Sequence, residues 1–361
     1  MSSKTVALEV HAGPRAFALL RGRSLQASDV RAVPAAAGGP KGLILNHVDR
    51  FLFGDWLKQS KQTVHLLGAS IGAWRMAVGC TNDPVQGFAD LAQGYIAQDY
   101  PHLPGKAPTS RDVSTQFAKS LATAFAGHEE AVLNHPRFRL HVFTSRGRHV
   151  LHRQGKLRTP VGYAGAFAAN AISRKALGGW LERVVFSDPR DALPVPLTDF
   201  RSRTSALSAA NLLPSIQASC SIPFWLDAVH DIPGAPRGAY WDGGITDYHL
   251  HLNYAALAEG VVLYPHFQNS VIPGWLDKGL KRRHAATPAL DNLVLLSPKS
   301  EWIKSLPNGK LPDRNDFKHY GDDLAGRIEA WTRAVNESKR LADELANWLA
   351  TGRGVEVKPL L

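Results

Sequence analysis

The chain has 361 residues, and its shares of hydrophobic residues (44%) and charged residues (20%) are those of a globular protein, which excludes a disordered chain. Length alone allows one large domain or two ordinary ones; we expect one large α/β unit, because such folds often exceed about 200 residues undivided. Lysine and arginine outnumber aspartate and glutamate by 42 to 31, so the formal net charge is +11 and favours anionic partners.

The N-terminal segment reads as three short strands. Residues 6–10 and 17–20 are apolar or alternating runs on either side of Gly13-Pro14, which predicts two strands joined by a turn. Residues 30–37 predict a third strand, although a proline at position 34 weakens that interpretation.

Two strand–turn–helix units follow in succession. The third strand runs into a glycine loop at residues 38–42 and then into apolar residues 43–52, which have helical spacing. A buried run at 63–67 passes through the turn 68–72 into a helical segment at 73–78. Such repeated units predict a mostly parallel sheet with helices on both faces, a three-layer α/β/α fold.

Beyond residue 100 the elements are less regular. Residues 100–110 are rich in proline, glycine and serine and predict a surface loop that could bound an insertion. Residues 204–220 favour a helix that Pro214 should break or restart and Pro223 should stop. Further strands are expected at residues 140–144, 184–187, 239–241 and 293–296.

The C-terminal segment contains a long apolar stripe. Between Leu324 and Trp348, apolar residues recur at steps of three or four, apart from one longer step, which predicts an amphipathic helix. We expect the stripe to pack on the sheet; a helix lying on a membrane or a partner is the alternative. The expected division is one α/β domain over residues 1–300, with the sequence motifs in about 30–250, and a helical extension over 301–361 packed on it.

The turn at residues 68–72 reads Gly-Ala-Ser-Ile-Gly. A serine at the centre of this pattern, between a buried strand and a helix, is held in a sharp turn that presents its hydroxyl, so Ser70 is the expected nucleophile of a serine acyl hydrolase. Gly68 and Gly72 flank it because larger residues would clash. The alternative is a tight packing turn without chemistry.

The glycine loop supplies the other half of an expected oxyanion hole. Gly38 and Gly39 can point backbone N–H groups into a cavity, as can Ile71 at the start of the next helix. Lys41 could orient the loop or meet an anionic headgroup, and Gly42 supports the motif. A phosphate-binding loop is the competing interpretation, but the endings of the nucleotide motifs are missing.

Ser70 needs a base, and the residues leave two mechanisms open. Asp242 stands at a strand end before Gly243 and Gly244, where its carboxylate can be approached closely. A triad would instead use an imidazole; the candidates are His249, His251 and His266. Asp247, His249 and His251 also alternate, so on a strand they would share a face and could hold a metal.

Four ordered signatures resemble those of the patatin-like phospholipases. They are residues 38–42, residues 68–72, the segment Ala218-Ser219-Cys220-Ser221-Ile222-Pro223, and Asp242-Gly243-Gly244. The resemblance implies a Ser70–Asp242 dyad with a glycine-loop oxyanion hole, and metal-free hydrolysis of fatty-acyl esters. One departure is Ala37, where the family loop usually has a further glycine. Trp74, Trp225 and Trp241 lie near these signatures and suit either an acyl pocket or the core.

These observations set the expected partners and location. We expect a lipid or other acyl-ester substrate, peripheral contact with an anionic membrane, no nucleic acid, no cofactor and no metal. The basic residues are scattered apart from one cluster: Lys278, Lys281, Arg282 and Arg283. With two cysteines, no apparent signal peptide and no apolar run of the roughly 18 residues that span a bilayer, the protein is expected in the cytoplasm. A catalytically inactive lipid-binding protein and a metal-dependent hydrolase remain as rivals.

Overall fold

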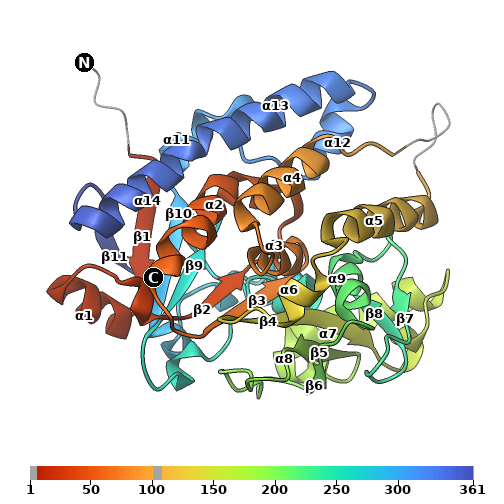
Figure 1. The fold of residues 1–361 in the computed structure, drawn as a ribbon. Coiled ribbons are helices and arrows are strands. Elements are labelled where there is room, and N and C mark those ends of the chain that lie inside the picture. The colour runs from red at the N-terminus through yellow and green to blue at the C-terminus, as the bar shows by residue number, and fades with distance from the viewer. Residues whose placement is uncertain (1–5, 101–107, 361) are drawn as a thin grey trace.

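A large, mostly parallel sheet lies between layers of helices in the computed structural model, which describes residues 6–100 and 108–360 (Figure 1). In the described residues the strand order is β11-β1-β10-β9-β2-β3-β4-β5-β6, with β8 paired to β4 and β7 to β8. The expected three-layer α/β/α class is therefore confirmed. The strands are β1 (Leu8–Ala12), β2 (Val30–Ala35), β3 (Val64–Ala69), β4 (Phe138–Gly147), β5 (Leu181–Ser187), β6 (Ser202–Ala206), β7 (Val229–His230), β8 (Ala239–Trp241), β9 (Val261–Pro265), β10 (Leu293–Pro298) and β11 (Val357–Pro359).

The helices alternate with these strands along much of the chain, as the two strand–turn–helix units predicted. They are α1 (Pro14–Gly22), α2 (Asn46–Gly54), α3 (Ile71–Gly79), α4 (Pro84–Ile96), α5 (Ser110–Phe125), α6 (Glu129–Leu133), α7 (Arg158–Ile172), α8 (Arg174–Leu177), α9 (Leu212–Cys220), α10 (Gly244–Asp247), α11 (Ser300–Lys304), α12 (Asn315–Tyr320), α13 (Leu324–Glu337) and α14 (Lys339–Thr351).

The centre of the sheet positions the candidate site. Strands β9, β2, β3 and β4 are parallel neighbours and almost wholly buried, as expected of strands covered on both faces. Because their carboxyl ends meet at one edge, the loop after β2 and the turn after β3 lie together. Pro34 is tolerated because β2 pairs with β9 only at Val30 and Ala32, before the proline.

Two predictions about local structure were wrong. Residues 17–20 belong to α1 rather than to a strand, because Pro14 at its first turn starts a helix whose inner side chains pack on the sheet. Residues 204–220 begin as the end of strand β6 and become helical only from Leu212. Pro214 lies in the first turn of α9, where no N–H donor is needed, so the helix begins there, as the expected restart allowed, and it ends at Cys220 before Pro223. Most of the expected 100–110 loop lies outside the described residues.

The C-terminal apolar stripe packs on the protein, but only its second half reaches the sheet as we expected, since α13 packs on a helix. It forms two helices rather than one, separated at Ser338, and its buried members include Trp331, Leu341, Leu345 and Trp348. Helix α14 lies over α2 and β1, and α13 over α4 (Figure 1). The final residues add a strand, β11, that pairs with β1. No helix in the described part of the chain has the length and apolarity needed to cross a membrane.

Candidate active site

Ser70 occupies a sharp turn between β3 and α3. Its backbone has φ +57° and ψ −131°, a strained conformation for a residue other than glycine and the one expected of a presented nucleophile. The flanking glycines are required by close packing: a Cβ at Gly72 would overlap the carbonyl oxygen of Ala35, and one at Gly68 would overlap the backbone of Ala73. The turn is therefore pressed against the end of β2.

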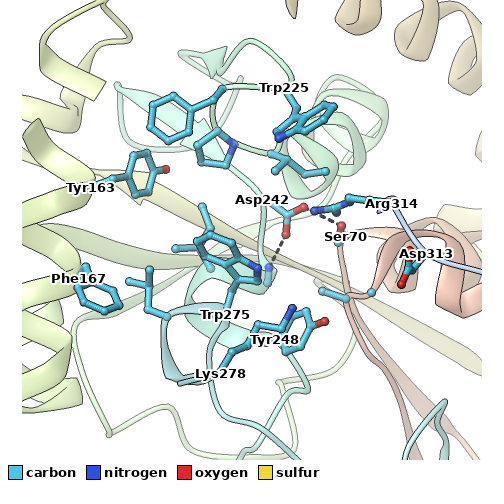
Figure 2. Close-up of a pocket in the computed structure, with 18 of the residues that line it drawn as sticks. Ser70, Tyr163, Phe167, Trp225, Asp242, Tyr248, Trp275, Lys278, Asp313 and Arg314 are labelled. Atoms are coloured by element: carbon cyan, nitrogen blue, oxygen red, sulfur yellow. Dashed lines mark hydrogen bonds between the residues drawn. The ribbon is translucent and has the colours of Figure 1, made fainter. Parts of the chain in front are cut away.

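Asp242 is the hydrogen-bond partner of the serine side chain. The Ser70 Oγ donates to Asp242 Oδ2 at 2.7 Å, and the Gly244 N–H donates to the other carboxylate oxygen, also at 2.7 Å (Figure 2). Asp242 follows β8 and is only 6% exposed, and Ser70 is 3% exposed. The structure thus brings together two residues that are far apart in the sequence, with the carboxylate oriented by a backbone donor.

Ser219 at the end of α9 and Ser221 just after it hold Ser70 and Asp242 in place through hydrogen bonds. The Ser219 hydroxyl donates to the Phe143 carbonyl at 2.6 Å and accepts the Ser70 N–H at 2.9 Å. The carbonyl oxygens of Ser219 and Ser221 accept the N–H groups of Gly243 and Asp242, at 3.0 and 2.9 Å. The sequence segment 218–223, to which no chemical task was assigned, is therefore the support that sets the distance between serine and carboxylate.

Burial raises the pKa of Asp242 to about 6. The positive charge of Arg314 and the hydrogen bonds from Ser70 and Gly244 act in the opposite direction but do not cancel the effect. No ion pair joins Asp242 to a cation in residues 6–100 and 108–360. A carboxyl group with this pKa is ionised at neutral pH yet is a stronger base than an ordinary aspartate.

The glycine loop lies beside the serine turn. Gly38 lines the pocket in front of Ser70, and Gly39 has φ +56°, a conformation that favours glycine. Ile71 is the first residue of α3, so its N–H has no acceptor within the helix, and its side chain packs on Gly42. The Ile71 N–H and the positive end of the α3 dipole thus lie next to Ser70, where they suit an oxyanion. Of the three expected donors, Gly38 is the one among the described residues that line the cavity.

A cavity of about 600 Å³ opens in front of Ser70 and Asp242 (Figure 2). Its walls are mainly apolar and aromatic, which suits an acyl chain. Trp225 lies in this wall, which is one of the two placements expected for it. Trp74 and Trp241 are buried in the core, the other expected placement. Its apolar and aromatic lining includes Pro160, Tyr163, Ala164, Phe167, Phe224, Trp225 and Trp275.

Three cations line the same cavity: Lys41, Lys278 and Arg314. Burial lowers the pKa of Lys41, and burial together with the charges of Lys41 and Arg314 lowers the pKa of Lys278 to about 8. The two ammonium groups lie over aromatic rings, Lys41 at 5.6 Å from the centre of Phe267 and Lys278 at 4.8 Å from that of Tyr248. Sequence reasoning singled out Lys41 but gave no role to Arg314, which lies in a segment without a recognisable motif.

The candidate histidines lie elsewhere. No histidine is among the described residues that line the cavity. His249 and His266 are buried beside each other with ring centres 4.3 Å apart, and each Nδ1 accepts a backbone N–H. Burial lowers the pKa of both rings, that of His266 to about 3. His251 contacts Thr287 instead, so none of the three is placed to receive the Ser70 proton.

The interpretation of residues 247–251 as one face of a strand was wrong. The turn at Gly243 leads into the short helix α10, so the three side chains diverge. Asp247 forms a buried ion pair with Arg183, with bonds of 2.5 and 2.8 Å. Within the described residues, no group of three or more histidine, cysteine, aspartate or glutamate side chains is arranged to hold a metal ion.

A scan of models of protein families finds none that matches this chain, and a search of curated proteins finds no match either.

Proposed function

We propose that the protein is a serine acyl hydrolase of the patatin-like type, with Ser70 as nucleophile and Asp242 as general base. The observation that carries the proposal is the 2.7 Å hydrogen bond from Ser70 Oγ to a buried carboxylate at the head of an apolar cavity. The strained serine turn and the elevated pKa of Asp242 support it, since both are features that catalysis uses and folding alone does not need.

The reaction begins when Ser70 Oγ attacks the ester carbonyl carbon and Asp242 Oδ2 accepts the hydroxyl proton. The carbonyl oxygen becomes an oxyanion that the N–H groups of Gly38, Gly39 and Ile71 stabilise, with Arg314 nearby. The tetrahedral intermediate then expels the alcohol, to which Asp242 returns the proton, and an acyl-serine remains.

Water completes the cycle. Asp242 accepts a proton from a water molecule as the water oxygen attacks the acyl carbonyl, and the second tetrahedral intermediate releases the fatty acid. The proton passes back to Ser70 Oγ, which restores the enzyme. The carboxylate serves as base in both halves of the reaction because its raised pKa suits proton transfer near neutral pH.

The apolar walls favour a fatty-acyl ester over a small polar one. A cavity of about 600 Å³ lined by aromatic side chains buries a hydrocarbon chain and thereby stabilises it by about 0.8 kcal/mol for each CH₂ group. The lining cations suit a headgroup phosphate or another anionic substituent near the ester.

Hydrolysis of p-nitrophenyl esters of increasing chain length tests the proposal. We expect Ser70→Ala to lower kcat by about a thousandfold or more, because the nucleophile is lost. Ser215→Ala is the matched control: this buried hydroxyl only donates to the Leu212 carbonyl in its own helix, so activity should persist. Full activity in Ser70→Ala would overturn the proposal, and an inactive wild type would favour the rival lipid-binding protein.

A further inference from the structure

The large hydrophobic side chains that are exposed in the described part of the chain lie on or beside helix α7, and four of them, Phe167, Phe224, Trp225 and Trp275, line the cavity. They belong to α7 or to segments that contact it: the η4 turn (His149–His152), the loop after α9 and the η6 turn (Trp275–Asp277). We call them the apolar collar: Val150, Leu157, Val161, Phe167, Ile172, Phe224, Trp225 and Trp275. Contiguous exposed patches of this kind mark interaction sites rather than ordinary surface.

Helix α7 shows the pattern most clearly. Its buried face includes Tyr163 and Ala166, whereas its outward face presents Val161 (59% exposed), Phe167 (55%) and Ile172 (82%). After Arg158 the helix contains no charged residue, although the solvent-facing side of a helix in a soluble protein normally carries charges. Both faces of this helix are therefore apolar, and only one of them is buried against other residues in the described part of the chain.

Basic residues stand at both ends of that helix. Lys156 and Arg158 are exposed at its start. At its end, Arg282 and Arg283 donate hydrogen bonds to the carbonyl oxygens of Ala171 and Asn170, at 3.0 and 2.8 Å. The basic cluster noted in the sequence thus flanks the collar, where Lys175 and Lys281 are also exposed.

We propose that the apolar collar docks on an anionic lipid surface, with the mouth of the cavity facing the lipid. Apolar side chains would enter the interface while the flanking lysines and arginines meet anionic headgroups. A second copy of the chain fits less well, because a twofold pair would bring these basic ends close to one another. In this orientation, a lipid ester passes from the membrane surface directly into the cavity. This part of the inference rests on the proposed function.

Vesicle sedimentation of the full chain carrying Ser70→Ala tests the docking without hydrolysis. The probes are vesicles of phosphatidylcholine alone and of phosphatidylcholine mixed with phosphatidylglycerol. On the mixed vesicles, we expect binding that falls by about tenfold or more when Leu157, Val161 and Ile172 are changed together to glutamine, because their insertion is lost. These three side chains do not line the cavity, so the same triple change in the active chain should preserve hydrolysis of a soluble short-chain ester.

A charge-matched pair tests the headgroup contact. Lys175→Glu with Lys281→Glu should weaken binding to the mixed vesicles, whereas Lys58→Glu with Lys61→Glu should not. The control changes the net charge equally, but Lys61 precedes β3 and so lies at the opposite edge of the sheet from Ser70. Equal losses of vesicle binding in the two double variants would overturn the assignment of the apolar collar and its basic flanks as the docking surface.

The remaining outcomes separate the two proposals. The docking proposal would be overturned if the triple variant bound the mixed vesicles as tightly as the unchanged collar does. It would also be overturned if the chain with the unchanged collar bound no vesicles but formed a dimer that the triple change abolished. Vesicle binding that depends on the collar, in a protein that cleaves no ester, would support the docking surface and overturn the proposed function.

Discussion

Two buried aspartates, Asp242 just before α10 and Asp247 at the last position of that helix, have opposite environments. Asp242 faces the cavity, accepts hydrogen bonds from Ser70 and Gly244, and has no ion-pair partner within the described residues. Asp247 points into the protein, where Arg183 donates two hydrogen bonds to it and the Thr246 hydroxyl a third at 2.8 Å.

The contrast shows what distinguishes the proposed catalytic carboxylate from a structural one. Burial is common to both, but only Asp242 combines a carboxylate without a compensating cation, a nucleophile within hydrogen-bond distance and access to a cavity. A buried charge without a counter-ion destabilises the folded protein. A buried charge in an ion pair cannot be removed without leaving its partner's charge uncompensated. The same substitution at the two positions should therefore have opposite effects on stability.

The largest effect is expected at the paired residue. Asp247→Asn leaves the Arg183 guanidinium with only Asp199 as an ionised partner, so we expect the free energy of unfolding to fall by about 3 kcal/mol. Urea unfolding followed by circular dichroism measures the change. Activity per folded molecule should stay near the wild-type value, and a stability loss below about 1 kcal/mol would show that the pair is not structural.

At neutral pH, Asp242→Asn should stabilise the folded protein, in contrast to Asp247→Asn. The pKa of Asp242 is about 6 in the folded protein against an ordinary 3.8, so its ionised form destabilises the fold. Removing the charge should raise the free energy of unfolding by about 3 kcal/mol well above pH 6, and most of the gain should be lost by pH 4, where the wild-type carboxyl binds a proton. Thermal unfolding at the two pH values measures this; a destabilised variant at pH 8 would contradict it.

The smallest effect concerns Arg314, whose charge lowers the pKa of Asp242. In the wild type, kcat/KM should fall as pH drops through about 6, because protonated Asp242 cannot accept the serine proton. Arg314→Gln should move this acid limb upward by up to about one pH unit. A pH–rate profile for a soluble ester measures the shift, and Lys278→Gln is the control from the same cavity. An unchanged acid limb in Arg314→Gln would show that the charge of Arg314 does not affect the pKa of Asp242.

How much of this the sequence predicted depends on how local each feature is. The strand, glycine loop and helix around residues 30–52, and the serine turn after β3, are set by neighbouring residues and were predicted close to their observed bounds. Asp242 was placed through ordered signatures, since no local pattern shows that it meets Ser70. The metal interpretation failed because alternation alone cannot tell a strand from a turn entering α10.

The features missed are those that depend on tertiary placement. Arg314 reaches the cavity from a segment before α12 that has no motif, so only the folded chain reveals it. The outward face of α7 is apolar, and an apolar helix in a sequence is read as buried. Two helices form where one was predicted, and the break at Ser338 falls in the one longer step of the apolar stripe, between Val335 and Leu341.

The most direct test of the central claim is the rate at which a fluorophosphonate probe labels Ser70, followed by mass spectrometry of the labelled peptide. The wild type and the folded fraction of Asp247→Asn should be labelled at similar rates on Ser70. Asp242→Asn should react at least about a hundredfold more slowly, because the base that accepts the serine proton is lost. Labelling of Asp242→Asn at the wild-type rate, or an adduct on another residue, would contradict the Ser70–Asp242 dyad.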